Sequence, residues 1–207
     1  MIRSVSSHDL QAAFLDHSIK TSGYDDHRDY IGLSTIAECP AEIYRRFFDS
    51  TPASVRRRLK TKASYEIEED LKARLKAIGI YSPGKEISLF DGMVKGHTDG
   101  ELFGALLEIK TVPLDDHIPQ GKIPIRVYWQ CQAYLKYGEY SLCHVLYYSR
   151  EDGLFRFFEV DPHAPTMNLI EGKLERLVRA VRTRTRPACE CGKCQDPEGA
   201  LQADGHR

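Results

Sequence analysis

The sequence predicts an α/β fold in which a central mixed β-sheet is flanked by helices, because strand-like segments lie in the middle of the chain and helix-like segments precede, separate and follow them. A hydrophobic content of 42% is enough to fill a core between such layers. The strands are expected at about 85–90, 93–99, 105–112, 142–149 and 154–160. The helices are expected at about 7–19, 40–49, 63–78, 125–137 and 166–183.

Turn residues mark the boundaries between the expected strands. Asp91-Gly92 is typical of a hairpin turn between the first two strands, and the stretch from Gly100 to Gly104 can close a hairpin before the third. Glu151-Asp152-Gly153 separates the last two strands. The closing helix shows the apolar spacing of an amphipathic helix, and it ends the expected fold.

The chain is expected to form one domain, since no long Ser-, Pro- or Gly-rich linker divides its 207 residues. This domain is expected over 1–195, with 196–207 as a flexible tail. No apolar stretch approaches the roughly 20 residues that span a bilayer, and no signal peptide opens the chain. We therefore expect no membrane association and a cytoplasmic location.

Three ionisable residues around the third expected strand indicate chemistry on a phosphodiester. Alternate side chains of a strand share one face, so Glu108 and Lys110 project together while Ile109 turns into the apolar layer. A hairpin through Gly100–Gly104 would bring the Asp99 carboxylate beside Glu108. Two carboxylates favour Mg²⁺ or Mn²⁺, with the Ile109 carbonyl as a further ligand and Lys110 serving the attacking water. The Glu-Ile-Lys tripeptide alone is also what alternating charges on a solvated strand produce.

Two further segments add candidate site residues. Gln130 and Tyr134 are four apart in an expected helix, so they face the same way and can hold a DNA end or a phosphate. The alternative is an ordinary core helix with a polar edge. In the helix before the sheet, Glu68 shares a face with Leu71 and Leu75, which makes it a candidate third metal-site acid.

The order of these segments resembles the PD-(D/E)XK nuclease superfamily, and specifically its RecB-like branch. The branch shows GxxD, (D/E)xK and QxxxY in this order, and the chain has GHTD at 96–99, EIK at 108–110 and QCQAY at 130–134. The resemblance implies a restriction-endonuclease-like core and a single-strand-preferring DNA exonuclease. It also implies that Asp99, Glu108, Lys110, Gln130 and Tyr134 form the catalytic set. Where members of the family place a histidine on the preceding helix, this chain has Tyr65.

A basic run before the expected sheet is the best candidate for contact with DNA. Neutral overall composition, with a formal net charge of −1, argues against a generally basic surface and directs attention to such local charge. A solvated helix face is the alternative. The run comprises Arg56, Arg57, Arg58, Lys60 and Lys62.

The cysteines indicate a separate metal centre. Cys189, Cys191 and Cys194 crowd a Gly-containing loop, where a metal or cluster needs several thiolates to converge, and a fourth ligand is then required. Cys131 and Cys143 lie in apolar segments and are expected to be buried thiols without a function. Disulfides are disfavoured because the terminal triplet leaves an odd cysteine.

The segment at 33–40 resembles the amino-terminal cysteine segment of the iron-sulfur RecB-like exonucleases, which include CRISPR-adaptation and AddB-type repair nucleases. That resemblance implies a 4Fe-4S cluster on Cys39, Cys189, Cys191 and Cys194, with cluster-binding segments around 33–46 and 187–195. The close spacing of the terminal triplet and Ala41, where the family has a basic residue, depart from its pattern. Zinc on the same thiolates is the alternative, and His206 can replace one of them.

The sequence therefore predicts a divalent-metal-dependent DNA nuclease that acts in CRISPR adaptation, recombination and repair, or phage DNA processing. One alternative is a catalytically silent scaffold with a structural zinc or iron-sulfur site, which binds DNA ends and delivers them to an integrase or helicase. A second alternative, an electron carrier, leaves the acidic and basic motif residues unexplained.

Overall fold

A computed structural model of the chain describes residues 29–48, 55–114, 117–192 and 194, without the side chains of 55–60. The expected helix at 7–19, the expected tail at 196–207 and His206 lie outside the described residues. The amino-terminal elements are β1 (Ile31–Gly32), the 3-10 helix η1 (Leu33–Thr35), α2 (Pro40–Phe48) and α3 (Val55–Ala77). The strands that follow are β2 (Tyr81–Pro83), β3 (Glu86–Leu89), β4 (Val94–His97), β5 (Gly100–Leu102) and β6 (Ala105–Val112). The last elements are α4 (Ile125–Gly138), β7 (Cys143–Ser149), β8 (Phe155–Val160) and α5 (Ala164–Thr183).

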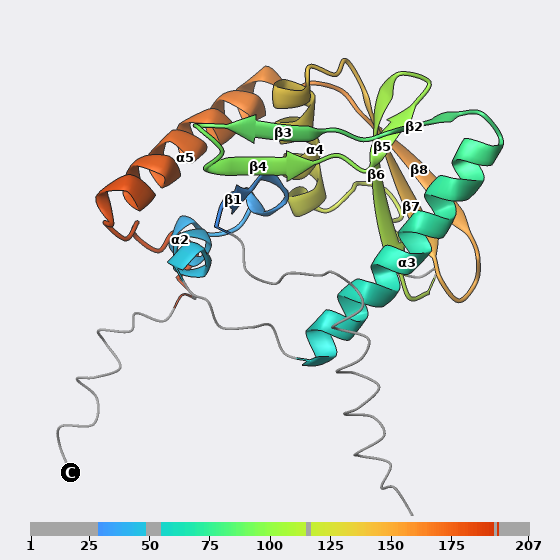
Figure 1. The fold of residues 1–207 in the computed structure, drawn as a ribbon, viewed down its shortest axis with the longest axis horizontal. Helices are drawn as coiled ribbons and strands as arrows, with labels where there is room; N and C mark the ends of the chain where they lie inside the picture. The colour runs from blue at the N-terminus through green and yellow to red at the C-terminus, as the bar shows by residue number, and fades with distance from the viewer. Residues whose placement is uncertain (1–28, 49–54, 115–116, 193, 195–207) are drawn as a thin grey trace, which may run out of the picture.

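The strands form two sheets, which confirms the expected α/β class with mixed pairing (Figure 1). The smaller sheet has the order β1-β4-β3, and the larger has the order β2-β5-β6-β7-β8. Strands β6 and β7 are parallel and joined through α4, whereas the other neighbours in the larger sheet are antiparallel. The chain passes from the smaller sheet to the larger one across Thr98 and Asp99.

A tight hairpin joins β5 to β6, as the glycines predicted. Phe103 and Gly104 have φ angles of 51° and 82°, the left-handed values that a two-residue hairpin turn needs at both positions. Gly100 pairs with Leu107, so one more residue along the register places Asp99 opposite Glu108. The turn therefore sets the relation between the first two motifs.

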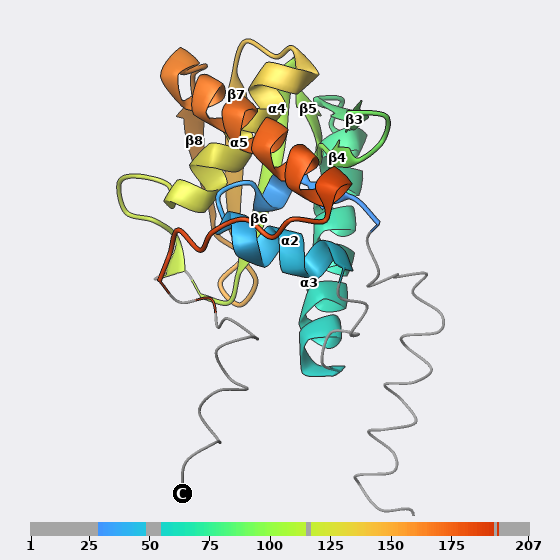
Figure 2. The same ribbon diagram turned by 90° about the vertical axis from the view of Figure 1, so that its left-hand side faces the viewer.

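Helices cover both faces of the larger sheet (Figures 1 and 2). On one face, Leu71 of α3 packs with Leu107 and Ile109 of β6. On the other face, Leu106 of β6 belongs to the main core, to which α4 and α5 contribute most of their apolar residues. Because side chains alternate along β6, Glu108 is on this second face, among apolar residues. Within the described residues, no helix combines the length and apolar content that crossing a bilayer requires.

Several elements differ from the expected ones. Helix α3 begins at Val55 instead of 63, because the Arg- and Lys-rich run contains good helix formers and no breaker. The strand expected at 93–99 ends at His97, where the Thr98 hydroxyl accepts a hydrogen bond from Lys85 N–H at 2.9 Å. Strands β1, β2 and β5 were not predicted, since two or three residues carry no periodicity.

Candidate active site and cysteine centre

A cleft of about 210 Å³ lies where the two sheets meet, and its lining comes from six different elements and the segment between the sheets. Every predicted catalytic residue lines it, so residues up to 66 positions apart in the sequence come together. The lining comprises Tyr30, Gly32, Ser34, Glu68, Lys95, Gly96, His97, Asp99, Glu108, Ile109, Lys110, Gln130 and Tyr134.

Asp99 and Glu108 are held side by side at this junction. The Ile109 N–H donates to Asp99 Oδ2 at 2.6 Å, which fixes the Asp99 carboxylate against β6. Glu108 is only 1% exposed, and its Oε1 forms an ion pair with Lys110 Nζ. Its Oε2 is buried and accepts no hydrogen bond from the described residues. A buried carboxylate oxygen without a partner is costly, so it is a strong sign of a missing ligand.

Helix α4 supplies the opposite wall of the cleft. Lys110 Nζ donates to Gln130 Oε1 at 3.2 Å, which ties β6 to the helix. Tyr134, one turn later, is 2% exposed, and its ring packs against the backbone of Gly96. The predicted shared face of Gln130 and Tyr134 is therefore present, and it points into the cleft.

Glu68 reaches the cleft from α3, as its helical spacing predicted. It forms an ion pair with Lys72 at 2.5 Å, so its charge is already compensated in part. Its acidic neighbours Glu66, Glu69 and Asp70 are exposed. Glu68 is thus the acid of this helix that faces Asp99 and Glu108.

Three carboxylates in one cleft shift each other's proton affinity. Burial raises the pKa of Asp99 well above its ordinary value, and the charges of Glu108 and Glu68 add to this effect. Burial also raises the pKa of Glu108, although Lys110 opposes the shift. The pKa of Lys110 is raised because attraction to Glu108 and Asp99 outweighs its own burial. The site therefore retains an ammonium and holds excess negative charge whenever its acids are ionised.

This donor set fits a hard divalent cation. Carboxylate oxygens are the ligands that Mg²⁺ and Mn²⁺ prefer, and a cation would relieve both the repulsion and the unpartnered Glu108 Oε2. The Ile109 carbonyl belongs to the same lining, so all four predicted metal-site residues are in reach of the cleft.

The sequence interpretation missed four cleft residues, Tyr30, Gly32, Ser34 and Lys95. Tyr30 and Ser34 belong to a short irregular segment that carries no periodic signal. Lys95 Nζ lies over the Tyr30 ring, 5.5 Å from its centroid. The only sequence signal for Lys95 was its place beside Gly96 in the first motif.

The predicted DNA-binding run forms the first turns of α3. The side chains of Arg56, Arg57, Arg58 and Lys60 lie outside the description. Lys62 is partly buried and forms an ion pair with Glu66 at 3.7 Å. The run remains a prediction.

The four predicted cysteine ligands converge on one point. The sulfurs of Cys39, Cys189, Cys191 and Cys194 all lie within 4.8 Å of one another. Successive pairs are 4.0, 3.6 and 3.4 Å apart, and none of the six cysteines forms a disulfide with another described residue. Backbone hydrogen bonds from Cys194 and Cys191 lower the pKa of Cys189 to about 6, which favours the thiolate that a metal requires. Cys131 and Cys143 are buried in the core, as expected.

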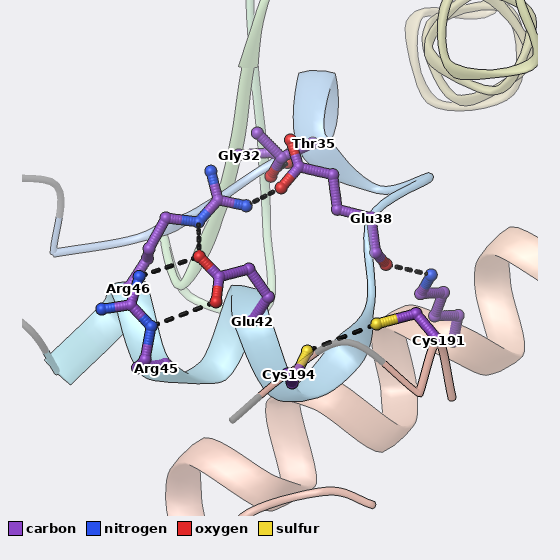
Figure 3. A network of polar contacts seen from close by, with 9 residues as sticks. Gly32, Thr35, Glu38, Glu42, Arg45, Arg46, Cys191 and Cys194 are labelled. Atoms are coloured by element: carbon purple, nitrogen blue, oxygen red, sulfur yellow. Dashed lines mark hydrogen bonds and ion pairs between the residues drawn. The ribbon is translucent and has the colours of Figure 1, made fainter. Parts of the chain in front are cut away.

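A polar network fixes the residue that precedes Cys39 (Figure 3). The Glu38 carboxylate forms an ion pair with Arg46 of α2, and the Glu38 carbonyl accepts from Lys173 Nζ of α5 at 2.6 Å. Figure 3 shows Cys191 and Cys194 beside this network. Helices α2 and α5 thereby hold Cys39 from both sides.

Comparison with known proteins identifies the fold. No protein-family model and no curated protein matches the chain. SSO0001 is similar at 17% identity and a TM-score of 0.52, over 84% of this chain and 87% of that one. An alkaline exonuclease, LHK-Exo from Laribacter hongkongensis, is similar at 15% identity and a TM-score of 0.56, over 77% of this chain and 91% of that one. The structure of LHK-Exo in complex with dAMP is similar at 16% identity and a TM-score of 0.55, over 75% of this chain and 89% of that one. The chain therefore shares the fold of these proteins, an alkaline exonuclease among them.

Proposed function

We propose that the protein is a divalent-metal-dependent nuclease. The observation that carries this proposal is the buried Oε2 of Glu108, which has no hydrogen-bond partner among the described residues. Glu108 shares its cleft with two further carboxylates and an ammonium. Hydrolysis of a phosphodiester uses this combination of charges. The fold shared with an alkaline exonuclease supports the same reaction class.

Asp99, Glu108, Glu68 and the Ile109 carbonyl would hold Mg²⁺ or Mn²⁺. The bound ion would supply Lewis acidity toward the scissile phosphate and lower the pKa of a water.

The residues of the chain then have distinct tasks in the proposed reaction. Lys110 orients the attacking water and offsets the negative charge that grows on the phosphorus oxygens. Gln130 accepts from Lys110 Nζ and so fixes the position of the ammonium. Tyr134 and Gln130 form the wall against which the substrate strand lies.

The proposed substrate is DNA with single-stranded or frayed ends, cut from the end. The dAMP complex of LHK-Exo shows a nucleotide bound by a protein of the same fold, and the basic run in the first turns of α3 is the proposed contact with the DNA backbone. CRISPR adaptation, recombination and repair, or phage DNA processing would use such an activity, with an integrase or helicase as the proposed protein partner.

Digestion of end-labelled DNA tests the proposal. Lys110→Met and Glu108→Gln should lower manganese-dependent cleavage by about 10³-fold or more, while DNA binding in chelator is largely retained. Lys136→Met is the matched control, because Lys136 forms a surface ion pair with Glu171 at 3.0 Å. Full activity in either site variant would refute the mechanism. A wild-type protein that binds DNA ends but cuts no substrate would support the scaffold alternative.

We further propose that the four cysteines hold a structural metal, and that zinc is its identity. A single tetrahedral ion with metal–sulfur bonds of about 2.3 Å keeps its sulfurs about 3.8 Å apart. Three of the six sulfur separations, 4.0, 3.6 and 3.4 Å, are close to that spacing, and none exceeds 4.8 Å. A 4Fe-4S cluster binds its four thiolates through four different irons and keeps them farther apart.

Anaerobic purification followed by metal analysis distinguishes zinc from an iron-sulfur cluster. A colourless protein with one zinc per chain is expected. A brown protein with about four irons per chain and a broad absorption band in visible light would establish the iron-sulfur cluster that the resemblance implies. Cys39→Ser should lose the metal, whereas Cys131→Ala should keep it.

A further inference from the structure

A second cavity, of about 500 Å³, lies along the carboxyl-terminal half of α5. Pro40 at the start of α2 and the segment that returns from α5 toward Cys189 form its other walls. This cavity is separate from the cleft, because the two share no lining residue.

Basic side chains dominate the charge of this cavity. Its lining contains Lys173, Arg176, Arg179 and Arg186, and only one acidic residue, Glu190. Positive charge of this density attracts phosphates.

Two of these arginines have no counter-charge among the described residues: Arg176 and Arg179 are exposed and form no ion pair there. The remaining arginine of α5, Arg182, pairs with Asp91 at 3.4 Å and does not line the cavity. Of the three arginines of α5, the two without an ion pair are therefore the ones that line the cavity.

The cavity also contains a buried cation and an apolar wall. Lys173 is 7% exposed, and its Nζ donates to Glu38 O at 2.6 Å and lies over the Trp129 ring, 5.4 Å from the centroid. An ammonium has three N–H donors, so it can still donate to a further acceptor. Leu177, Ala180 and Pro187 supply apolar surface next to it. An anion with apolar parts fits this combination better than a bare inorganic ion.

One short segment connects the cavity to the cleft. Ser34 lines the cleft and Pro40 lines the cavity, so at most about 20 Å of chain separates them. A few nucleotides of a single strand span this distance.

We propose that this cavity binds the phosphodiester backbone of a single-stranded DNA segment that extends from the cleft. Arg176 and Arg179 bind successive phosphates, Lys173 binds the innermost one, and the apolar wall packs against sugars and bases. This inference rests on the proposed nuclease function for the identity of the polymer. It adds a second contact that favours long single strands over short ones.

Fluorescence anisotropy in the presence of a chelator measures DNA binding without cleavage and so tests the proposed contact. The test variant carries both Arg176→Ala and Arg179→Ala. The double substitution should lower the affinity for a single strand of about 16 nucleotides about tenfold, and it should leave the affinity for a single strand of about 4 nucleotides unchanged. The dependence of log affinity on log salt should become shallower by about 0.7 for each arginine.

The matched control is Arg74→Ala with Arg182→Ala, which removes the same charge from two arginines paired with Asp70 and Asp91 outside the cavity. Equal weakening by both double variants would overturn the proposal, because it would show a general charge effect. Wild-type affinity of the Arg176/Arg179 variant for the long strand would also overturn it, as would an acidic peptide that binds the cavity while oligonucleotides do not. A wild type that cuts no DNA would refute the nuclease function alone, since the binding comparison stands without cleavage.

Discussion

Gly96 and Tyr134 are in direct contact across the cleft: a Cβ added at Gly96 would lie 2.6 Å from Tyr134 Cε1 and 2.8 Å from Leu33 Cδ1. The first residue of the first motif therefore packs against the last residue of the third. A hydrogen atom is the largest group that fits between this strand and the tyrosine ring. The contact gives a steric reason for a glycine at this position beside the acids of the cleft.

Gly96→Ala should destabilise the fold by about 1–3 kcal/mol, because the new methyl group overpacks a buried contact. Denaturant unfolding measures the change. A double-mutant cycle with Tyr134→Leu should show a favourable coupling, since the smaller side chain makes room. Gly121→Ala is the control and should have little effect, because a Cβ there meets nothing within 4 Å. Equal stability of Gly96→Ala and wild type would contradict the contact.

Asp99→Asn should stabilise the metal-free protein at neutral pH. Burial and the neighbouring carboxylates raise the pKa of Asp99 in the folded state, so its contribution to stability is fully present below the ordinary carboxyl pKa and is lost as pH rises through the raised one. The melting temperature of the wild type in chelator should thus fall relative to Asp99→Asn as pH rises above the ordinary carboxyl pKa of about 4.

Asp70→Asn provides the comparison for that pH series, because Asp70 is exposed and forms an ion pair with Arg74 at 2.8 Å. It should show no stabilisation as pH rises. Parallel curves for wild type and Asp99→Asn would argue against the raised pKa.

Gln130→Ala should lower the cleavage rate about 10–100-fold, because Lys110 loses the acceptor that orients it. The loss should be in the maximal rate more than in substrate binding. Gln120→Ala removes an amide that accepts from Arg156 at 3.1 Å on the surface, and it should leave the rate unchanged. A pure change in affinity would instead assign Gln130 to substrate binding.

Cys39→Ser should destabilise the protein by about 2–5 kcal/mol, because the proposed metal would close a loop of 150 residues between Cys39 and Cys189. Thermal unfolding with and without a strong chelator gives the measurement. The wild type and Cys131→Ala should lose stability in chelator, and Cys39→Ser should not. Chelator insensitivity of the wild type would contradict a metal at these thiolates.

Sequence reasoning succeeded where a residue's position follows from a local rule. Strand alternation placed Glu108 and Lys110 together, the hairpin glycines placed Asp99 beside them, and helical spacing turned Glu68 toward the sheet. These rules act over a few residues, so they can be read without knowing the rest of the fold.

The features of the fold and of the two sites that the sequence did not predict depend on contacts between segments that are distant in the sequence. The division into two sheets and the parallel pairing of β1 with β4 arise from tertiary packing, which leaves no periodic signal in two residues. The sequence likewise does not predict that Arg182 forms an ion pair and Arg176 does not, because the pair depends on where Asp91 lies in the folded chain. The spacing of the sulfurs, which bears on the choice of metal, is also a property of the folded chain.

Asp99 belongs to neither sheet, because β4 ends at His97 and β5 begins at Gly100. The strand before it, ending at His97, pairs in the smaller sheet, and the strand after it, beginning at Gly100, pairs in the larger one, whereas Glu108 lies within the larger sheet alone. A substitution that rotates one sheet relative to the other, even far from the cleft, should therefore change the separation of the two acids and impair the proposed binding of a cation in a protein that still folds normally.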